Sequence, residues 1–364
     1  MDIQEISHQR LNNQCLTSQK KFKTPQEVVR WLGAVQSQDY PSAKWALGLR
    51  LPLGITDEDI EKAFNDGKIL RTHLMRPTWH FITPEYIRWI LALTAPRVKI
   101  LMSHYNRRLN LDKNIFAQSQ KVISKALQGG NDLTRPELAA LLKKAGISAH
   151  PQSLGHIIME AELDGIICSG ARRGKHSTYA LLDERVPKSK LFTREEALTE
   201  LVKRYFTSHS PATLQDFSWW SGLTIADARQ GIEKMKSQAK SEIINGKTYW
   251  SAKSLASASQ KNNFPRVHLL PNYDEYIISY KDRSAIFDRA HQKKLGPRNH
   301  IFYHSIVMDG QIVGSWKRTS KKNSMLIETN IFVHLDTEGR SALATAIEQY
   351  SQFVGLPVNV IERK

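Results

Sequence analysis

Apolar residues at helical spacing follow three copies of one helix-start signal along this chain. Each copy has a threonine cap and a glutamate three positions later, which together form a capping box. The three copies occupy residues 24–27, 134–137 and 193–196. After the first box, Val28, Val29 and Leu32 form one apolar stripe. The pattern predicts three amphipathic helices, each packed on its apolar face.

Short segments with strand character lie downstream of each of these helices. They pair as hairpins at residues 69–75 with 79–82, 166–168 with 178–182, and 241–244 with 247–250. Helices followed by a two-stranded hairpin are typical of a winged-helix module. We therefore predict an α+β chain, mainly helical, with three tandem winged-helix modules and a small β-rich C-terminal lobe.

Turn signals and changes of composition divide the predicted chain. We expect winged helices at 1–105, 106–186 and 187–260, with the lobe at 261–364 completing the third module. In the third module, Ser210-Pro211 is expected to open a helix that carries Trp219 and Trp220. The lobe is predicted to hold a strand at 266–270, a basic run at 289–299, a hairpin at 305–316, a helix at 338–353 and an edge strand at 358–361.

Two glutamines follow the first apolar stripe. Gln36 lies four residues after Leu32, so it falls on the core-facing side, where an unpaired polar group costs roughly 1–3 kcal/mol. On a helix, Gln36 and Gln38 would point about 200° apart, whereas on an extended chain residues i and i+2 share one face. If both serve one site, the helix must end near Ser37. Asp39 would then face away from both glutamines, which favours a structural role over one that supports the site from behind.

The charge balance favours a polyanionic partner. Lys and Arg outnumber Asp and Glu by 52 to 35, which gives a formal net charge of +17. Such an excess most often accompanies nucleic-acid binding, although a merely basic protein is the alternative. Only Cys15 and Cys168 are present, and this number fits a reducing cytoplasm and no disulfide framework. We expect a cytoplasmic, nucleoid-associated monomer that binds duplex DNA, with no membrane segment, metal or cofactor.

Several cationic residues are candidates for contacts with DNA phosphates. The tip of the second hairpin carries Arg172, Arg173 and Lys175, and three cations on a wing favour a phosphate contact over a solvated loop. Arg71 lies in the first strand of the first hairpin and Arg76 in its turn, where they either hold phosphates or lie on a solvated edge. His80 in the next strand is a site residue or a packed core histidine. The last candidates lie at the end of the hairpin of the lobe and just after it: Trp316, Lys317 and Arg318.

Two acidic residues stand out in the basic lobe. Asp274 and Glu275 are either functional carboxylates or ion-pair partners for Lys281 and Arg283, and the second reading is favoured.

Five blocks of the chain resemble the tandem winged-helix DNA glycosylases related to AlkZ. They are Gly33-Ala34-Val35-Gln36-Ser37-Gln38-Asp39 and the segments 45–50, 71–81, 270–276 and 309–316. The resemblance implies three winged helices around duplex DNA and excision of alkylated bases, including some interstrand crosslinks. It also implies a catalytic signature, which is Gln-apolar-Gln in one branch of the family and Gln-apolar-Asp in another, and Gln36 and Gln38 match the first branch. Ser37 departs from it, because serine is not apolar.

The chemistry of an amide pair agrees with that implication. A glutamine is not titratable near neutrality, so it positions water and stabilises charge rather than abstracting a proton. An N7-alkylated guanine is cationic and leaves as a neutral base, so no general acid is needed. The pair therefore predicts hydrolysis of cationic purine lesions. The alternatives are a non-catalytic winged-helix regulator and, as the weakest, an RNA-binding protein.

Overall fold

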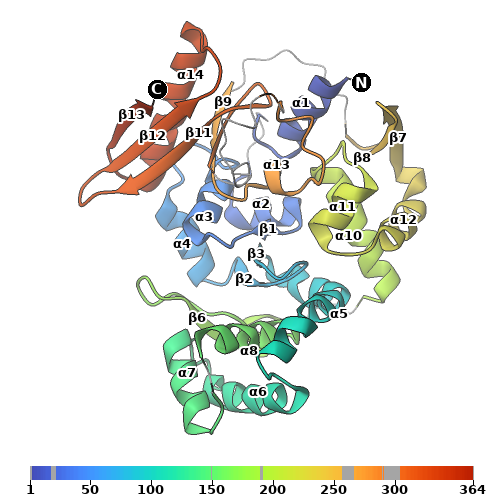
Figure 1. The fold of residues 1–364 in the computed structure, drawn as a ribbon, viewed down its shortest axis with the longest axis vertical. Helices are drawn as coiled ribbons and strands as arrows, with labels where there is room; N and C mark the ends of the chain where they lie inside the picture. The colour runs from blue at the N-terminus through green and yellow to red at the C-terminus, as the bar shows by residue number, and fades with distance from the viewer. Residues whose placement is uncertain are drawn as a thin grey trace.

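The computed structural model describes residues 2–17, 22–148, 150–188, 192–255, 266–288, 290 and 304–363. One order of elements recurs three times in it: a helix, a short strand or bridge, two helices and a hairpin (Figure 1). The first unit follows helix α1 (Ile3–Asn13) and forms a three-stranded sheet of order β1-β3-β2. Its elements are α2 (Pro25–Leu32), β1 (Val35–Gln36), α3 (Tyr40–Gly48), α4 (Asp57–Asn65), β2 (Leu70–His73) and β3 (Trp79–Ile82).

The second unit repeats this order below the first in Figure 1, after the long helix α5 (Pro84–Arg108). Its sheet has the order β4-β6-β5, which matches that of the first unit strand for strand. The elements are α6 (Lys113–Leu127), β4 (Leu133–Thr134), α7 (Arg135–Lys144), α8 (Pro151–Leu163), β5 (Ile167–Ser169), β6 (Thr178–Leu181) and the short α9 (Leu182–Arg185).

In the third unit, an isolated bridge between Ala212 and Trp250 takes the place of the first strand. The other elements are α10 (Arg194–Ser208), α11 (Leu214–Ser221), α12 (Ile225–Lys234), the 3-10 turn η1 (Lys236–Gln238), β7 (Ala239–Ile244) and β8 (Lys247–Ala252). Helix α11 begins after Thr213, whose capping box with Asp216 defines its start. The predicted start at Ser210-Pro211 is therefore wrong.

The C-terminal part forms a five-stranded sheet of order β13-β12-β11-β10-β9, in which only β13 runs parallel to its neighbour. The predicted edge strand is thus confirmed as β13, while strand β12 and helices α1 and α6 were not predicted. The predicted basic run at 289–299 lies outside the described residues except for Ala290. The elements are β9 (Val267–Leu270), α13 (Glu275–Ile278), β10 (Ser305–Met308), β11 (Gln311–Ser320), β12 (Met325–Ile331), α14 (Thr337–Val354) and β13 (Val358–Arg363).

The three predicted capping boxes are confirmed at the starts of α2, α7 and α10. Helix α2 nevertheless ends at Leu32, five residues before Ser37, near which the sequence placed its end if both glutamines serve one site. Gly33 has a φ of +83°, a left-handed conformation that terminates the helix at little cost because glycine lacks a Cβ. The chain is therefore already extended when it reaches Gln36.

The largest hydrophobic cluster joins the first unit to the C-terminal sheet, although the sequence predicted that this lobe would complete the third unit. The indole N–H of Trp45 in α3 donates to the Leu269 carbonyl oxygen over 2.7 Å. Nearby, the buried Arg50 guanidinium binds both carboxylate oxygens of Asp274, at 2.8 and 2.9 Å. These contacts place α13 and its flanking residues directly against the β1 segment. None of the described helices is long and apolar enough to cross a membrane.

Candidate active site around Gln36 and Gln38

Strand β1 is the edge of its sheet, and it holds Gln36 in an extended backbone. Gln36 lies opposite His80 of β3, and the next backbone N–H, that of Ser37, donates to the Trp79 carbonyl oxygen over 2.7 Å. Asp39 ends the extended run as the cap of α3, accepting from the Ser42 backbone N–H at 3.2 Å. Asp39 thus has the structural contact that the sequence suggested.

The orientation of both glutamine amides follows from their donors. The Arg76 guanidinium Nη2 donates to Gln36 Oε1 over 2.5 Å, and the Trp79 backbone N–H donates to Gln38 Oε1 over 3.2 Å. Guanidinium and backbone N–H groups can only donate, so each amide turns its oxygen toward the protein. Within the described residues, neither Nε2 has a protein partner. Gln36 is almost fully buried, whereas Gln38 is exposed.

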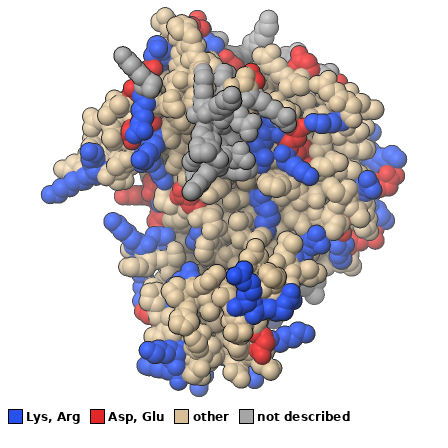
Figure 2. All heavy atoms as spheres, viewed as in Figure 1, with Lys and Arg blue, Asp and Glu red and all other residues tan. Residues whose placement is uncertain are grey.

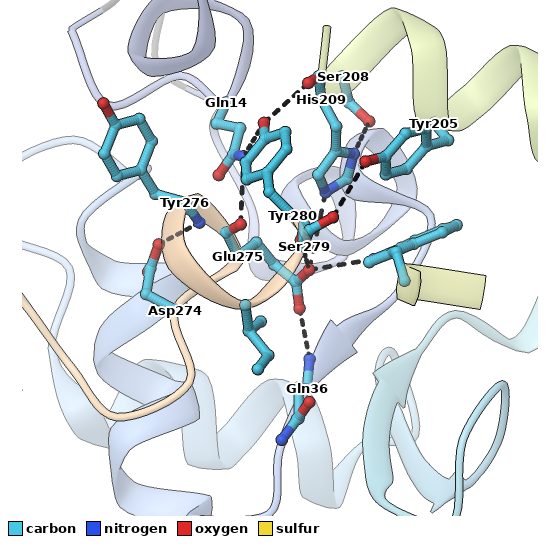
Figure 3. Close-up of polar contacts among 12 residues, drawn as sticks. Gln14, Gln36, Tyr205, Ser208, His209, Asp274, Glu275, Tyr276, Ser279 and Tyr280 are labelled. Atoms are coloured by element: carbon cyan, nitrogen blue, oxygen red, sulfur yellow. Dashed lines mark hydrogen bonds and ion pairs between the residues drawn. The ribbon is translucent and has the colours of Figure 1, made fainter. Parts of the chain in front are cut away.

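Glu275 of α13 supports Gln36 from the other side (Figure 3). Its Oε1 accepts the Gln36 backbone N–H over 2.7 Å, which is the N–H that an edge strand leaves without a partner. Its Oε2 accepts from the Trp220 indole at 3.1 Å and from the Ser279 hydroxyl. Burial opposes ionisation, but His209, whose Nε2 lies 3.7 Å away, and the hydrogen bonds from the Ser279 hydroxyl and the Gln36 backbone outweigh it and lower the pKa of Glu275 to about 2. The carboxylate is therefore ionised at neutral pH.

His80 is a buried and neutral neighbour of the pair. Its Nδ1 lies 2.9 Å from the Thr78 carbonyl oxygen, and its Nε2 is buried with no hydrogen-bond partner among the described residues. Burial, and then the positive charge of Arg76, lower the pKa of His80 to about 3. The imidazole therefore carries no charge at neutral pH.

A cleft between the first and second units is lined by Arg71 and Trp79, both of which contact Gln38. Its volume is about 240 Å³. Arg71 packs against Trp79 in its wall, with the guanidinium carbon 4.4 Å from the ring centroid, and its Nε donates to the Ser37 carbonyl oxygen over 3.1 Å. The lining residues are Arg71, Trp79, Thr134, Arg135, Pro136, Lys175, His176, Ser177 and Tyr179. Cations and aromatic rings thus converge next to the glutamines.

The three predicted cations of the wing differ in their contacts. Arg172 pairs with Glu61 over 3.0 Å, and Arg173 pairs with Glu137. Lys175 is exposed and forms no ion pair with any described residue. Lys175 is thus the cation of this tip that is most available for a phosphate.

The predicted contacts in β11 need a correction. Trp316 is only 4% exposed, and its indole N–H donates to the Leu270 carbonyl oxygen over 2.8 Å, so its ring serves the core and is not available to DNA. Arg318 donates to the Tyr350 hydroxyl over 2.7 Å, whereas Lys317 is exposed. Only Lys317 and Arg318 therefore remain candidates in this strand.

The predicted ion pairs of Asp274 and Glu275 with Lys281 and Arg283 are wrong. Asp274 binds Arg50, and Glu275 binds Gln36, Trp220 and Ser279. One feature of the sequence indicated burial instead: Glu275 is followed directly by Tyr276, Ile277 and Ile278, and an acidic residue that is buried with such neighbours has to find hydrogen-bond donors. Arg50 and Trp220 were not predicted to have any role at this site.

Lys and Arg side chains outnumber acidic ones over the second unit on the face shown in Figure 2. The described residues contain no group of three His, Cys, Asp or Glu side chains that would hold a metal ion. The chemistry that the described groups offer is thus that of two oriented amides, a guanidinium and a buried carboxylate.

Comparisons with known proteins bear on the family to which the chain belongs. The family model described as "DNA glycosylase AlkZ-like" matches residues 29–353. The solved structure of the DNA glycosylase AlkZ from Streptomyces sahachiroi is similar over 99% of this chain and 100% of that one, with a TM-score of 0.78 and 19% identity. A search of curated proteins finds no match. The family model spans most of the chain, and on that ground the chain belongs to the AlkZ-like family of DNA glycosylases.

Proposed function

We propose that this DNA glycosylase hydrolyses the N-glycosidic bond of cationic alkylated purines of the N7-alkylguanine type. The observation that carries the proposal is the pair of neutral, oriented amides of Gln36 and Gln38 on one extended segment. The neighbouring His80 is neutral, Asp39 caps a helix and Glu275 is buried beneath Gln36. None of these groups is placed to protonate the departing base. The substrate should therefore already carry a good leaving group, as a cationic purine does.

The reaction follows from these groups. The bond between sugar C1′ and purine N9 breaks, and its electron pair goes to the base, which leaves neutral because it was positively charged. Water adds to C1′ and loses one proton to solvent. The Oε1 atoms of Gln36 and Gln38 each keep a second lone pair for a water hydrogen, and the Nε2 groups donate to oxygen or nitrogen acceptors of the substrate. Orientation and charge stabilisation then supply the rate enhancement.

We further propose that the three repeated units are winged helices that surround duplex DNA. The support is their common order of helix, short strand or bridge, two helices and hairpin. The cleft with Arg71, Arg135 and Lys175 lies beside Gln38, where it would hold the sugar-phosphate backbone near the lesion. Interstrand crosslinks between two N7 positions carry the same cationic linkage, so unhooking them falls within this chemistry.

The direct test is base release from a duplex that contains N7-methylguanine. Free base is measured by chromatography and abasic sites by alkaline cleavage, under single-turnover conditions. We expect release by the wild type and a loss of it in Gln36→Ala and Gln38→Ala, with DNA binding retained. Lys125→Ala, on the exposed face of α6, is the matched surface control and should behave as wild type. Equal release by all four proteins would exclude the assigned roles, and no release by the wild type would exclude the substrate.

A further inference from the structure

We propose that Glu275 is a positioning residue of the active site and the anion that offsets the positive charge developing on the sugar. This inference rests on the proposed function. It follows from where the carboxylate lies: on α13, directly behind the Gln36 backbone, with an oxygen 2.7 Å from the Gln36 nitrogen (Figure 3).

A strand edge does not require a carboxylate. The outward N–H groups of edge strands are ordinarily satisfied by water or by neutral acceptors. Here the acceptor is a charged group that is 1% exposed, brought from a position 239 residues along the chain. Removing an ion from water costs free energy. One hydrogen bond to the backbone N–H of Gln36 does not account for burying a carboxylate there, so the charge itself is expected to have a role.

The neighbouring acidic residue shows what a purely structural carboxylate looks like in this fold. Asp274 is also buried, but both of its oxygens are bound by the Arg50 guanidinium, at 2.8 and 2.9 Å. The positive charge of Arg50 therefore neutralises the Asp274 carboxylate locally. Glu275 has no Lys or Arg of the described chain within ion-pair distance. Its nearest potential cation is His209, whose Nε2 lies 3.7 Å away.

His209 does not cancel the charge of Glu275 at neutral pH. The imidazole is fully buried against the rings of Tyr205 and Trp220, and its Nδ1 lies 2.8 Å from the Ser208 hydroxyl. Burial lowers the pKa of His209 below its ordinary value, although Glu275 works against that shift. Glu275 therefore retains a net negative charge, held by neutral donors.

The Glu275 carboxylate lies behind Gln36, on the side of the site where the sugar would develop its positive charge. Gln36 separates Glu275 from Arg76, because Glu275 binds its backbone and Arg76 binds its side chain. A cationic purine and an oxocarbenium-like sugar would be repelled by Arg76 alone, whereas the buried carboxylate restores a near-neutral surrounding. Charges act strongly across a protein interior that excludes water, and a fixed anion needs no reorganisation during the reaction.

The test separates charge from structure by a binding measurement that needs no catalysis. Two duplexes are compared, one with a pyrrolidine abasic analogue, which carries a cation in place of the sugar, and one with the neutral tetrahydrofuran analogue. We expect the wild type to bind the pyrrolidine duplex on the order of tenfold more tightly. Glu275→Gln keeps the side-chain shape but removes the charge, and it should abolish this preference.

Asp216→Asn is the matched control. It removes another fully buried carboxylate of the same core, one that accepts the Lys281 and Asp282 backbone N–H groups and touches neither glutamine. Asp216→Asn should keep the wild-type preference. Glu275→Asp retains the anion but withdraws it by one methylene group, so it should show a reduced preference. If Glu275→Gln fails to fold, the binding preference of Glu275→Asp still tests the role of the Glu275 charge.

The outcomes are distinct. A preference that is absent in the wild type, or unchanged in Glu275→Gln or Glu275→Asp, overturns the role of Glu275. A cation preference that depends on Glu275 in a protein that releases no N7-methylguanine supports this role while excluding the proposed substrate.

Discussion

The Arg76 guanidinium, in the turn between β2 and β3, donates a 2.5 Å hydrogen bond to the Gln36 side chain of β1. This contact determines which end of the Gln36 amide faces the substrate, because Arg76 can only donate. It also joins the candidate catalytic segment to a turn that no local sequence pattern connects with it.

Replacing Arg76 by alanine should slow base release by roughly 10- to 100-fold, since a freely rotating Gln36 amide loses its productive orientation. Arg76→Lys preserves the charge but not the reach of the guanidinium fork, so it should restore only part of the rate. Single-turnover kinetics on an N7-methylguanine duplex measure the effect. Lys125→Ala removes an exposed cation of α6, away from the site, and controls for net charge. A wild-type rate in Arg76→Ala would contradict the orienting role.

Lys175 is expected to contribute one phosphate contact. Lys175→Gln should lower the slope of log K against log salt by about 1, because one fewer cation displaces counterions from DNA. Arg173→Gln should change the slope less, since Arg173 is already paired with Glu137. Fluorescence anisotropy over a series of salt concentrations gives both slopes. Equal slopes for Lys175→Gln and the wild type would mean that Lys175 makes no phosphate contact, which contradicts the prediction.

His80 should make stability depend on acidity. Its pKa is about 3 in the folded protein and near 6.5 when unfolded, so below pH 6.5 only the unfolded chain takes up the proton. The part of the free energy of unfolding that depends on neutral His80 is therefore fully present above pH 6.5, and it is lost as the pH drops from 6.5 toward 3.

At pH 5, His80 is expected to lower the free energy of unfolding by about 2 kcal/mol, because each pH unit below 6.5 costs about 1.36 kcal/mol. Urea unfolding at pH 7.5 and pH 5.0 measures it. The loss between these two pH values should be smaller by about this amount in His80→Gln than in the wild type, because glutamine does not titrate. The same loss in both proteins would mean that His80 is protonated in the fold.

Gly222 should not tolerate a side chain. It ends α11 with a φ of +71°, and a Cβ built on it would lie 2.1 Å from the Met75 carbonyl oxygen. Gly222→Ala therefore has to move the turn that carries Arg76, at a cost of about 1–3 kcal/mol or more. Urea unfolding and base release should both decline. Gly130→Ala, at another positive φ with nothing within 4 Å, is the control and should lose stability but not activity.

Local signals predicted much of the fold, because they act over a few residues. The capping boxes at Thr24, Thr134 and Thr193 and the Asn245-Gly246 turn are confirmed. The α+β class is confirmed as well. The end of α2 was misplaced because the apolar stripe continues through Gly33 to Gln36, while the backbone at Gly33 is left-handed.

The surroundings of the two glutamines could not be predicted in this way. Gln36 receives its support from Glu275, which is 239 residues away, and from Arg76 across a hairpin. Asp274 and Glu275 are adjacent in sequence and equally acidic, yet one binds Arg50 and the other binds Gln36. No periodicity distinguishes two such neighbours, because their partners are brought to them only by packing of the C-terminal sheet on the first unit.

The shared core of the first unit and the C-terminal sheet also bears on the order in which the chain folds during synthesis. Trp45 and Arg50 emerge from the ribosome early, but Leu269 and Asp274, which complete their surroundings, follow more than 200 residues later. The second unit has its own hydrophobic cluster and can fold in the meantime. We therefore expect the segment with the two glutamines to become ordered last, so that a prematurely terminated chain exposes apolar surface and has no assembled active site.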